Sequence, residues 1–132
     1  MRILSKAVKQ LKAEQTYAKL IKKLDKVFSI FIRKRDKGKC FTCSTQKNYK
    51  DMDAGHYKKR QHLGTRWDER NVNCQDTSCN SFKGGNMDIY AIRLEEKYGY
   101  GILQELEELK KKDKKYKTSE LEFLINKYAK TK

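Results

Sequence analysis

Residues 40–86 read CFTCSTQKNYKDMDAGHYKKRQHLGTRWDERNVNCQDTSCNSFKGGN, and this stretch decides the fold. It begins with the pair Cys40 and Cys43 and carries a second pair, Cys74 and Cys79, near its end. Paired cysteines in tight turns are typical zinc ligands, because each turn points two thiolates at one ion and two turns complete a tetrahedron. Between the pairs the sequence is punctuated by glycine and has no helical period, which predicts two short strands joined by loops. The pattern indicates a small α+β core that is stabilised by structural zinc, Zn²⁺.

The second cysteine pair departs from the usual zinc-knuckle spacing. Four residues separate Cys74 from Cys79, whereas two separate Cys40 from Cys43. Either a wider loop supplies both thiols, or Asp76 replaces Cys74 as the fourth ligand. Cys40, Cys43 and Cys79 are therefore the firmer ligands, and the fourth remains open between Cys74 and Asp76.

The segments on either side of this core are predicted to be helical. The 132 residues make one compact unit. Within it, residues 1–39 form a basic amphipathic helix, or two with a break near Gln15, because apolar residues recur at helical spacing up to Phe31. Residues 40–86 form the zinc-stabilised core, and residues 87–132 form C-terminal helices.

The charge of the chain favours a polyanionic partner. Lys and Arg number 32 against 17 Asp and Glu, which gives a net charge of +15 and favours nucleic acid, with DNA the leading expectation. A membrane is not expected, because residues 1–39 lack the apolar core of a signal peptide and no stretch is long enough to span a bilayer. A cytoplasmic location follows, and a reducing compartment favours metal binding over disulfides. The N-terminal helix either grips DNA or presents a solvated face, and its apolar stripe permits a homodimer.

Three polar residues of the core suit phosphodiester hydrolysis, which needs a general base and a cation. His56 is the predicted base, since an imidazole accepts a proton near neutral pH. Asn71 is predicted to orient the ring by accepting its N–H, and Asn80 to place an amide oxygen on Mg²⁺ or Mn²⁺. The alternatives are a structural histidine, a turn asparagine and a helix N-cap.

The catalytic metal needs an anionic ligand as well. Asp53 lies two residues before Gly55 on the same face of the predicted strand, and the missing side chain of Gly55 leaves room for this carboxylate. Asp68 and Glu69 are the alternatives. Cationic residues near the predicted centre are the natural phosphate contacts: Lys58, Lys59, Arg60, His62, Arg66 and Lys83. Trp67 is expected in the core rather than stacked on a base.

The order of these residues resembles that of HNH nucleases, which share the ββα-metal fold. In many of them a histidine ends a strand, an asparagine follows, and a Cys-x-x-Cys knuckle leads directly into a third His or Asn and then a Lys. His56, Asn71, Asn80 and Lys83 stand in that order here. In the register of that superfamily the first knuckle cysteine falls at Asp76. Many members also place Asp or His immediately before the catalytic histidine, where this chain has Gly55.

Longer strings resemble the NinG (Rap) family of lambdoid phage recombination endonucleases. They are RWDERNV at residues 66–72, within the longer GHYKKRQHLGTRWDERNVNCQDTSCNSFKGGN, and IYAIRLEEKYG at residues 89–99. The resemblance covers most of the chain and is strongest over residues 53–99. It implies cleavage of branched recombination intermediates such as D-loops and Holliday junctions, other recombination proteins as partners, and a bacteriophage protein acting in the host cytoplasm.

Two other functions are compatible with the same residues. One is a non-catalytic zinc-ribbon protein that binds nucleic acid as a recombination accessory factor, and the other is a degenerate nuclease fold that binds without turnover. Both predict zinc, basicity and salt-sensitive DNA binding. The role of His56 separates them from the enzyme.

Overall fold

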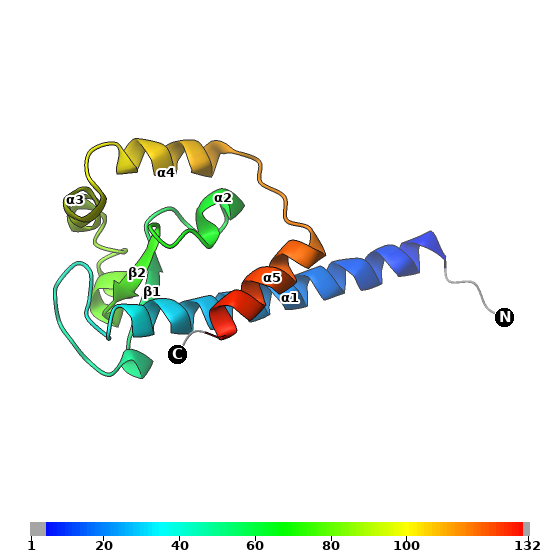
Figure 1. Cartoon of the computed structure of the whole chain (residues 1–132), viewed down its shortest axis with the longest axis horizontal. Coiled ribbons are helices and arrows are strands. Elements are labelled where there is room, and N and C mark those ends of the chain that lie inside the picture. The colour runs from blue at the N-terminus through cyan, green and yellow to red at the C-terminus, as the bar shows by residue number, and fades with distance from the viewer. Residues whose placement is uncertain (1–4, 131–132) are drawn as a thin grey trace.

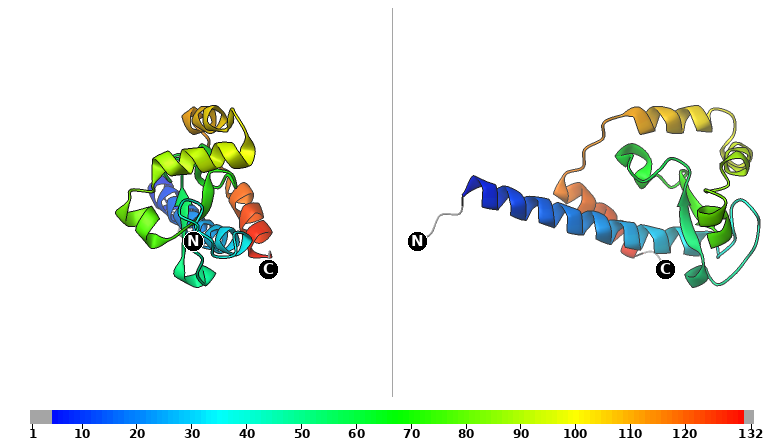
Figure 2. Two further views of the ribbon diagram at one scale, coloured as in Figure 1. Left: turned by 90° about the vertical axis from the view of Figure 1, so that its left-hand side faces the viewer. Right: turned by 180° about the vertical axis from the view of Figure 1, so that it is seen from behind.

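The fold is mixed α+β and mostly helical, with one small sheet, in a computed structural model that describes residues 5–130. The elements in chain order are α1 (Lys6–Arg35), the 3₁₀ helix η1 (Tyr49–Asp51), β1 (Asp53–His56), α2 (Leu63–Arg66), β2 (Val72–Gln75), the π-helix η2 (Ser78–Phe82), α3 (Met87–Tyr98), α4 (Ile102–Lys111) and α5 (Thr118–Ala129). Figure 1 shows the sheet between α1 and α5 on one side and α3 and α4 on the other, and the end-on view in Figure 2 agrees.

The helix predicted over residues 1–39 forms as one helix, α1, which begins at Lys6, ends at Arg35 and has no break at Gln15, while residues 1–4 lie outside the described part of the chain. Its first turn is capped by the Ser5 hydroxyl, which accepts a hydrogen bond from the Val8 amide at 3.2 Å. The C-terminal half buries a stripe at helical spacing, Leu24, Phe28 and Ile32. The N-terminal half extends beyond the rest of the chain, and its apolar residue Leu11 is 54% exposed.

The main core forms where α1 packs against α5 and the start of β2. It contains the buried residues Leu24, Phe28, Ile32, Trp67, Val72, Leu121, Ile125 and Tyr128. Trp67 is buried there, as predicted, and its indole Nε1 donates a hydrogen bond to the Asp25 carboxylate at 2.9 Å. A second cluster of Tyr90, Leu94, Ile102 and Leu106 joins α3 to α4.

The sheet is a single antiparallel pair, in which Asp53 lies opposite Gln75 and His56 opposite Val72. The connection between the strands is long enough to contain α2. No helix among residues 5–130 is both long and apolar enough to cross a bilayer.

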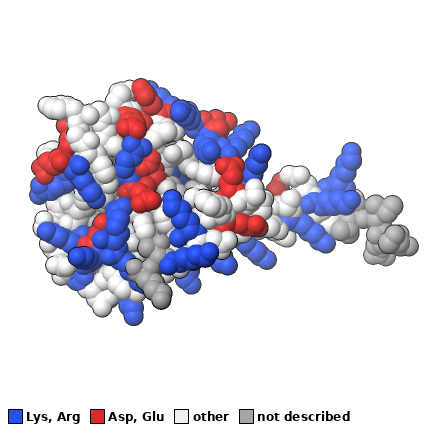
Figure 3. Space-filling model, in the orientation of Figure 1, with Lys and Arg blue, Asp and Glu red and all other residues white. Residues whose placement is uncertain are grey.

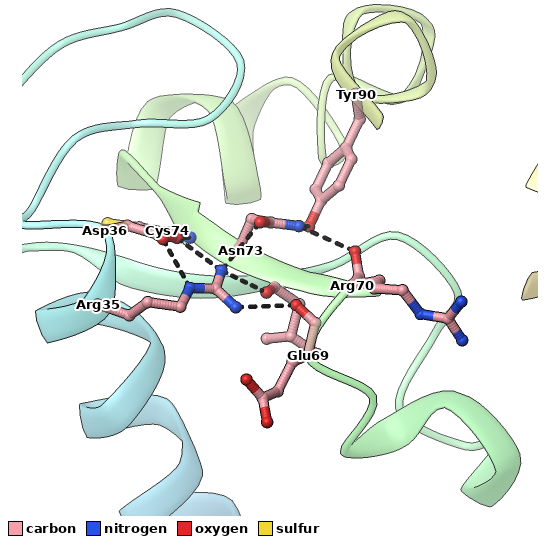
Figure 4. Close-up of polar contacts among 8 residues, drawn as sticks. Arg35, Asp36, Glu69, Arg70, Asn73, Cys74 and Tyr90 are labelled. Atoms are coloured by element: carbon pink, nitrogen blue, oxygen red, sulfur yellow. Dashed lines mark hydrogen bonds and ion pairs between the residues drawn. The ribbon is translucent and has the colours of Figure 1, made fainter. Parts of the chain in front are cut away.

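A network at the end of α1 fixes β2 against the helix (Figure 4). The Arg35 guanidinium donates hydrogen bonds to the carbonyls of Glu69 and Val72 and to the Asn73 amide oxygen, at 2.9 to 3.1 Å. Its neighbour Asp36 accepts the Cys74 amide at 2.8 Å. Charged groups therefore satisfy the backbone of the loop and strand that carry the site.

Candidate metal and catalytic site

Three thiols come together between the loop after α1 and the π-helix η2. The sulfur atoms of Cys40, Cys43 and Cys79 all lie within 4.8 Å of one another. Cys40 and Cys79 are buried and Cys43 is exposed. Three thiols at this separation are a donor set that can bind a metal such as zinc.

The environment of Cys40 favours its thiolate. Burial raises the pKa of this thiol, but hydrogen bonds from the Thr42 hydroxyl and from the backbone at Asp76 and Cys43 outweigh it and lower the pKa to about 7. A thiol with a lowered pKa is more readily deprotonated, which metal binding requires.

Among the described residues, the group of three close thiols includes neither predicted fourth ligand. Cys74 packs against Cys40 and Cys79, but the group of sulfurs within 4.8 Å in the described part of the chain does not include it. Burial, with Asp36 and Cys40 nearby, raises the pKa of Cys74 to about 12. The Asp76 carboxylate forms an ion pair with Lys47 at 2.7 Å and accepts the Ser78 hydroxyl at 2.6 Å.

The π-helix η2 connects the thiol group to a second feature of the site. The Asp76 carbonyl accepts the amides of both Cys79 and Asn80, at 3.0 and 2.9 Å. Cys79 joins the thiols, while Asn80 lines a hollow with Ala54, His56, Lys59, Arg60 and Gln61. The Asn80 amide also donates a hydrogen bond to the Asp53 carboxylate at 3.2 Å. The structure therefore brings His56 and Asn80 to one hollow and Asp53 to its edge.

His56 is held in one tautomer by the backbone. Its ring nitrogen Nε2 lies 3.0 Å from the Arg66 carbonyl, and a carbonyl can only accept, so Nε2 carries the proton and Nδ1 has the free lone pair. Burial lowers the pKa of His56 to about 4, with a further lowering by the Arg60 charge, although the Arg66 hydrogen bond acts in the opposite direction. The ring is therefore neutral at pH 7 and able to accept a proton.

Asn71 occupies a different position from the one predicted. Its amide oxygen accepts the Lys58 backbone N–H at 2.7 Å, and its NH₂ group donates to the carbonyls of Lys58 and Thr65 at 3.0 Å. The predicted hydrogen bond to His56 is thus replaced by the one from His56 to Arg66, next to Thr65. The buried Asn71 amide pins the loop that carries this carbonyl, because a side-chain amide can satisfy several backbone groups at once.

The space at Gly55 is not available to Asp53. A Cβ atom at Gly55 would overlap the side-chain oxygen of Gln75. The Gln75 side chain is fully buried and donates to the Thr42 hydroxyl at 3.2 Å and to the Gly85 carbonyl at 2.9 Å. The prediction that Gly55 leaves room for the Asp53 carboxylate is therefore wrong, since Gln75 from the facing strand fills that room.

Gly55→Ala is expected to lower the free energy of unfolding by about 1–3 kcal/mol, because the added methyl group overpacks a buried site. Chemical denaturation followed by circular dichroism measures this change. The double variant Gly55→Ala/Gln75→Ala provides the control, and it should lose less stability than the sum of the two single variants. Additive losses would contradict the contact between Gly55 and Gln75.

Four of the six predicted phosphate contacts fall into two groups. Lys58 forms an ion pair with Glu107 at 2.7 Å, and Arg66 pairs with Asp25. These two cations hold the site loop to α4 and α1. Lys59 and Arg60 line the hollow beside His56 without an ion pair to any described residue. Of the others, Lys83 is exposed beyond η2, and His62 precedes α2.

The carboxylates predicted as alternative ligands of a catalytic metal form contacts elsewhere. Asp68 pairs with Arg70 at 2.9 Å, and Glu69 accepts the Tyr128 hydroxyl at 3.0 Å.

Sequence reasoning missed Arg35, Asp36 and Gln75, which position the strands of the site. Arg35 lies in a basic run whose other members look the same, so spacing alone carried no signal for it.

Comparison with known proteins gives a match to one family model over nearly the whole chain and matches to curated proteins over two thirds of it. The model of the family described as "Bacteriophage Lambda NinG protein" matches residues 2–132. The protein named "Protein ninG" from Salmonella phage P22 is 36% identical over 89 residues, which cover 66% of this chain and 43% of that protein. Its namesake from Escherichia phage lambda is 34% identical over 89 residues, with 66% and 43% covered. The match thus spans less than half the length of these relatives, and no solved structure matches the chain.

Proposed function

Because the chain belongs to the NinG family, we propose that it is a metal-dependent HNH-type endonuclease that hydrolyses phosphodiester bonds in branched DNA during recombination. The observation that carries this proposal is the neutral imidazole of His56, with its free Nδ1, in the same hollow as Asn80 and two cations that form no ion pair within residues 5–130. A base, an amide ligand and phosphate contacts in one place are the parts that hydrolysis of a phosphodiester requires.

Each residue of the hollow has a distinct part in the proposed reaction. His56 removes a proton from the attacking water, and the Arg66 carbonyl keeps the ring in the productive tautomer. Lys59 and Arg60 hold the phosphate and offset its charge. The lowered pKa of His56 makes it a weak base but ensures that it is not already protonated at pH 7.

The donor set at Asn80 and Asp53 fits a hard divalent cation. The Asn80 NH₂ group donates to the Asp53 carboxylate at 3.2 Å, which leaves the amide oxygen of Asn80 out of this bond. Mg²⁺ and Mn²⁺ prefer oxygen donors such as this amide oxygen and the Asp53 carboxylate. These two residues would hold the ion, which supplies electrostatic stabilisation of the charge that develops on the phosphate. The three thiols, as softer donors, would hold a separate structural zinc.

Cleavage of end-labelled DNA tests the proposal. Linear duplex, fork, D-loop and four-way junction are incubated with the zinc-loaded protein and Mg²⁺, Mn²⁺ or no added divalent metal. We expect cutting that needs the added metal and favours the branched substrates. A folded protein that binds these DNAs and cuts none of them would instead be a non-catalytic zinc-ribbon accessory protein or a degenerate nuclease.

Acidification is expected to destabilise the protein through His56. In the unfolded chain a histidine has a pKa near 6.5, and the folded value of about 4 means that the unfolded state binds more protons between these pH values. This contribution to stability is present above pH 6.5 and is lost as the pH falls towards 4. Denaturation at pH 7 and pH 4.5 should show a loss of about 2–3 kcal/mol from this group. The variant His56→Gln supplies the baseline, because every other titrating group is retained, and an equal loss in that variant would contradict the assignment.

A further inference from the structure

A second hollow lies beside the catalytic one. It is lined by residues of the loop before α2 and of the end of α4: Gln61, His62, Leu63, Lys110, Lys111, Lys112, Asp113 and Lys114. Gln61 lines both hollows, so the two share a wall. We call this surface, residues 61–63 with residues 110–114, the lysine groove.

Specific contacts hold the two sides of the lysine groove together. Gly64 packs so closely on the end of α4 that a Cβ atom there would overlap the Leu109 carbonyl oxygen. Two ion pairs also join α4 to the site loop, Lys58 with Glu107 and Arg70 with Glu105, each at 2.7 Å. The groove is therefore a fixed part of the fold, in a defined position relative to His56.

The lysine groove carries an excess of positive charge. Four lysines line it, with Asp113 as the one acid among its lining residues. Lys111 and Lys112 form no ion pair within 4 Å among residues 5–130. Lys110 and Lys114 form long ion pairs, at 3.6 Å with Glu107 and 3.9 Å with Glu120, and exposed pairs of this kind bind weakly. Figure 3 shows blue side chains over the end of α4 and the connection to α5, with some red side chains among them.

We propose that the lysine groove binds the DNA backbone next to the bond that is cut. This inference rests on the proposed nuclease function and extends its substrate site. Phosphates follow one another along a strand at a rise of about 3.4 Å, so a strand whose phosphate sits among Lys59 and Arg60 presents further phosphates along its path. The shared wall at Gln61 brings the groove, with Lys111 and Lys112 that form no ion pair within residues 5–130, next to that phosphate.

The double variant Lys111→Gln/Lys112→Gln tests this assignment by binding, without reference to cleavage. Fluorescence anisotropy with a labelled four-way junction, in buffer without divalent metal, gives the Kd as a function of salt. We expect Kd to rise about tenfold at 0.1 M salt, and the slope of log K against log salt to become less steep by about 2, since each phosphate contact contributes about 0.9. The melting temperature should not change, because both side chains are exposed.

The variant Lys9→Gln/Lys12→Gln is the matched control, with the same loss of charge at the exposed start of α1. Its Kd should change less than twofold. Equal losses in the two variants would show a general effect of net charge and overturn the assignment, as would an unchanged salt slope in the groove variant. If the groove variant loses affinity for an acidic peptide but keeps its affinity for DNA, the groove is a protein-binding surface, and this result would also overturn the assignment. Because the binding measurement needs no cleavage, it can contradict the groove assignment even when the wild type cleaves DNA. It can also support the assignment in a protein that does not cleave.

Discussion

Replacing His56 by glutamine is expected to slow cleavage of branched DNA by about 10²- to 10⁴-fold, the range over which a general base contributes. Glutamine keeps an N–H that can donate to the Arg66 carbonyl, so the loop that surrounds the hollow retains its partner. It lacks a nitrogen lone pair that can accept the proton of a water molecule. The single-turnover rate with Mg²⁺ measures the loss, and His56→Ala should reproduce it.

The same variants separate a chemical role of His56 from a structural one. DNA affinity, zinc content and melting temperature should remain close to those of the wild type in His56→Gln. Tyr100→Ala is the control variant, since this side chain is 98% exposed and lines neither hollow. If His56→Gln cuts at the wild-type rate, His56 is a buried structural histidine and the base must be sought elsewhere.

Replacing Cys43 by serine is expected to remove the proposed structural metal and to destabilise the core strongly. This thiol is exposed, so its loss leaves no cavity and reports the metal alone. Structural zinc contributes about 10–16 kcal/mol in small zinc domains, which exceeds the whole stability of a typical single domain. Mass spectrometry under native conditions should show zinc on the wild type but not on Cys43→Ser, together with a large fall in melting temperature.

Cys74 and Asp76 provide the comparison for this experiment. Cys74→Ala should retain zinc, because Cys74 lies outside the group of three close sulfurs. Asp76→Asn should also retain it, since the carboxylate is bound to Lys47 and Ser78. Zinc loss in only one of the two would identify that residue as the fourth ligand and would require its side chain to reorient when metal binds.

Cleavage should fail in Cys43→Ser even though no residue of the hollow is changed. Cys79 and Asn80 are neighbours on η2, and both of their amides bond to the Asp76 carbonyl. The thiol group therefore sets the position of Asn80. Cleavage that persists in a zinc-free but folded variant would show that the two parts of the site are independent.

The parts of the fold that local spacing determines were predictable from the sequence. The helical spacing of apolar residues up to Phe31 predicted α1, and the turn with Cys40 and Cys43 predicted two members of the thiol group. What the sequence could not provide was the partner of each polar side chain. Spacing placed Asp53 and Gly55 on one strand face, but it did not show that Gln75 from β2 would occupy that face.

The role of Asn71 was missed for the same physical reason. A buried amide bonds to whichever backbone groups the tertiary fold brings near, and here these belong to Lys58 and Thr65. The carbonyl that orients His56 belongs to Arg66. Every residue has a backbone carbonyl, so the residue type gives no signal for this contact. Side-chain to backbone contacts of this kind are therefore the least predictable part of the site.

The length of α1 and its attachment to β2 define the distance between the start of the helix and the hollow that contains His56. A continuous helix of 30 residues is about 45 Å long, and the salt-bridged pair Arg35 and Asp36 ties its last turn directly to β2. A rotation of α1 is therefore expected to move β2 as well. Anything fastened to the first turns of α1 is held at a set distance and bearing from His56, whatever its own affinity for DNA.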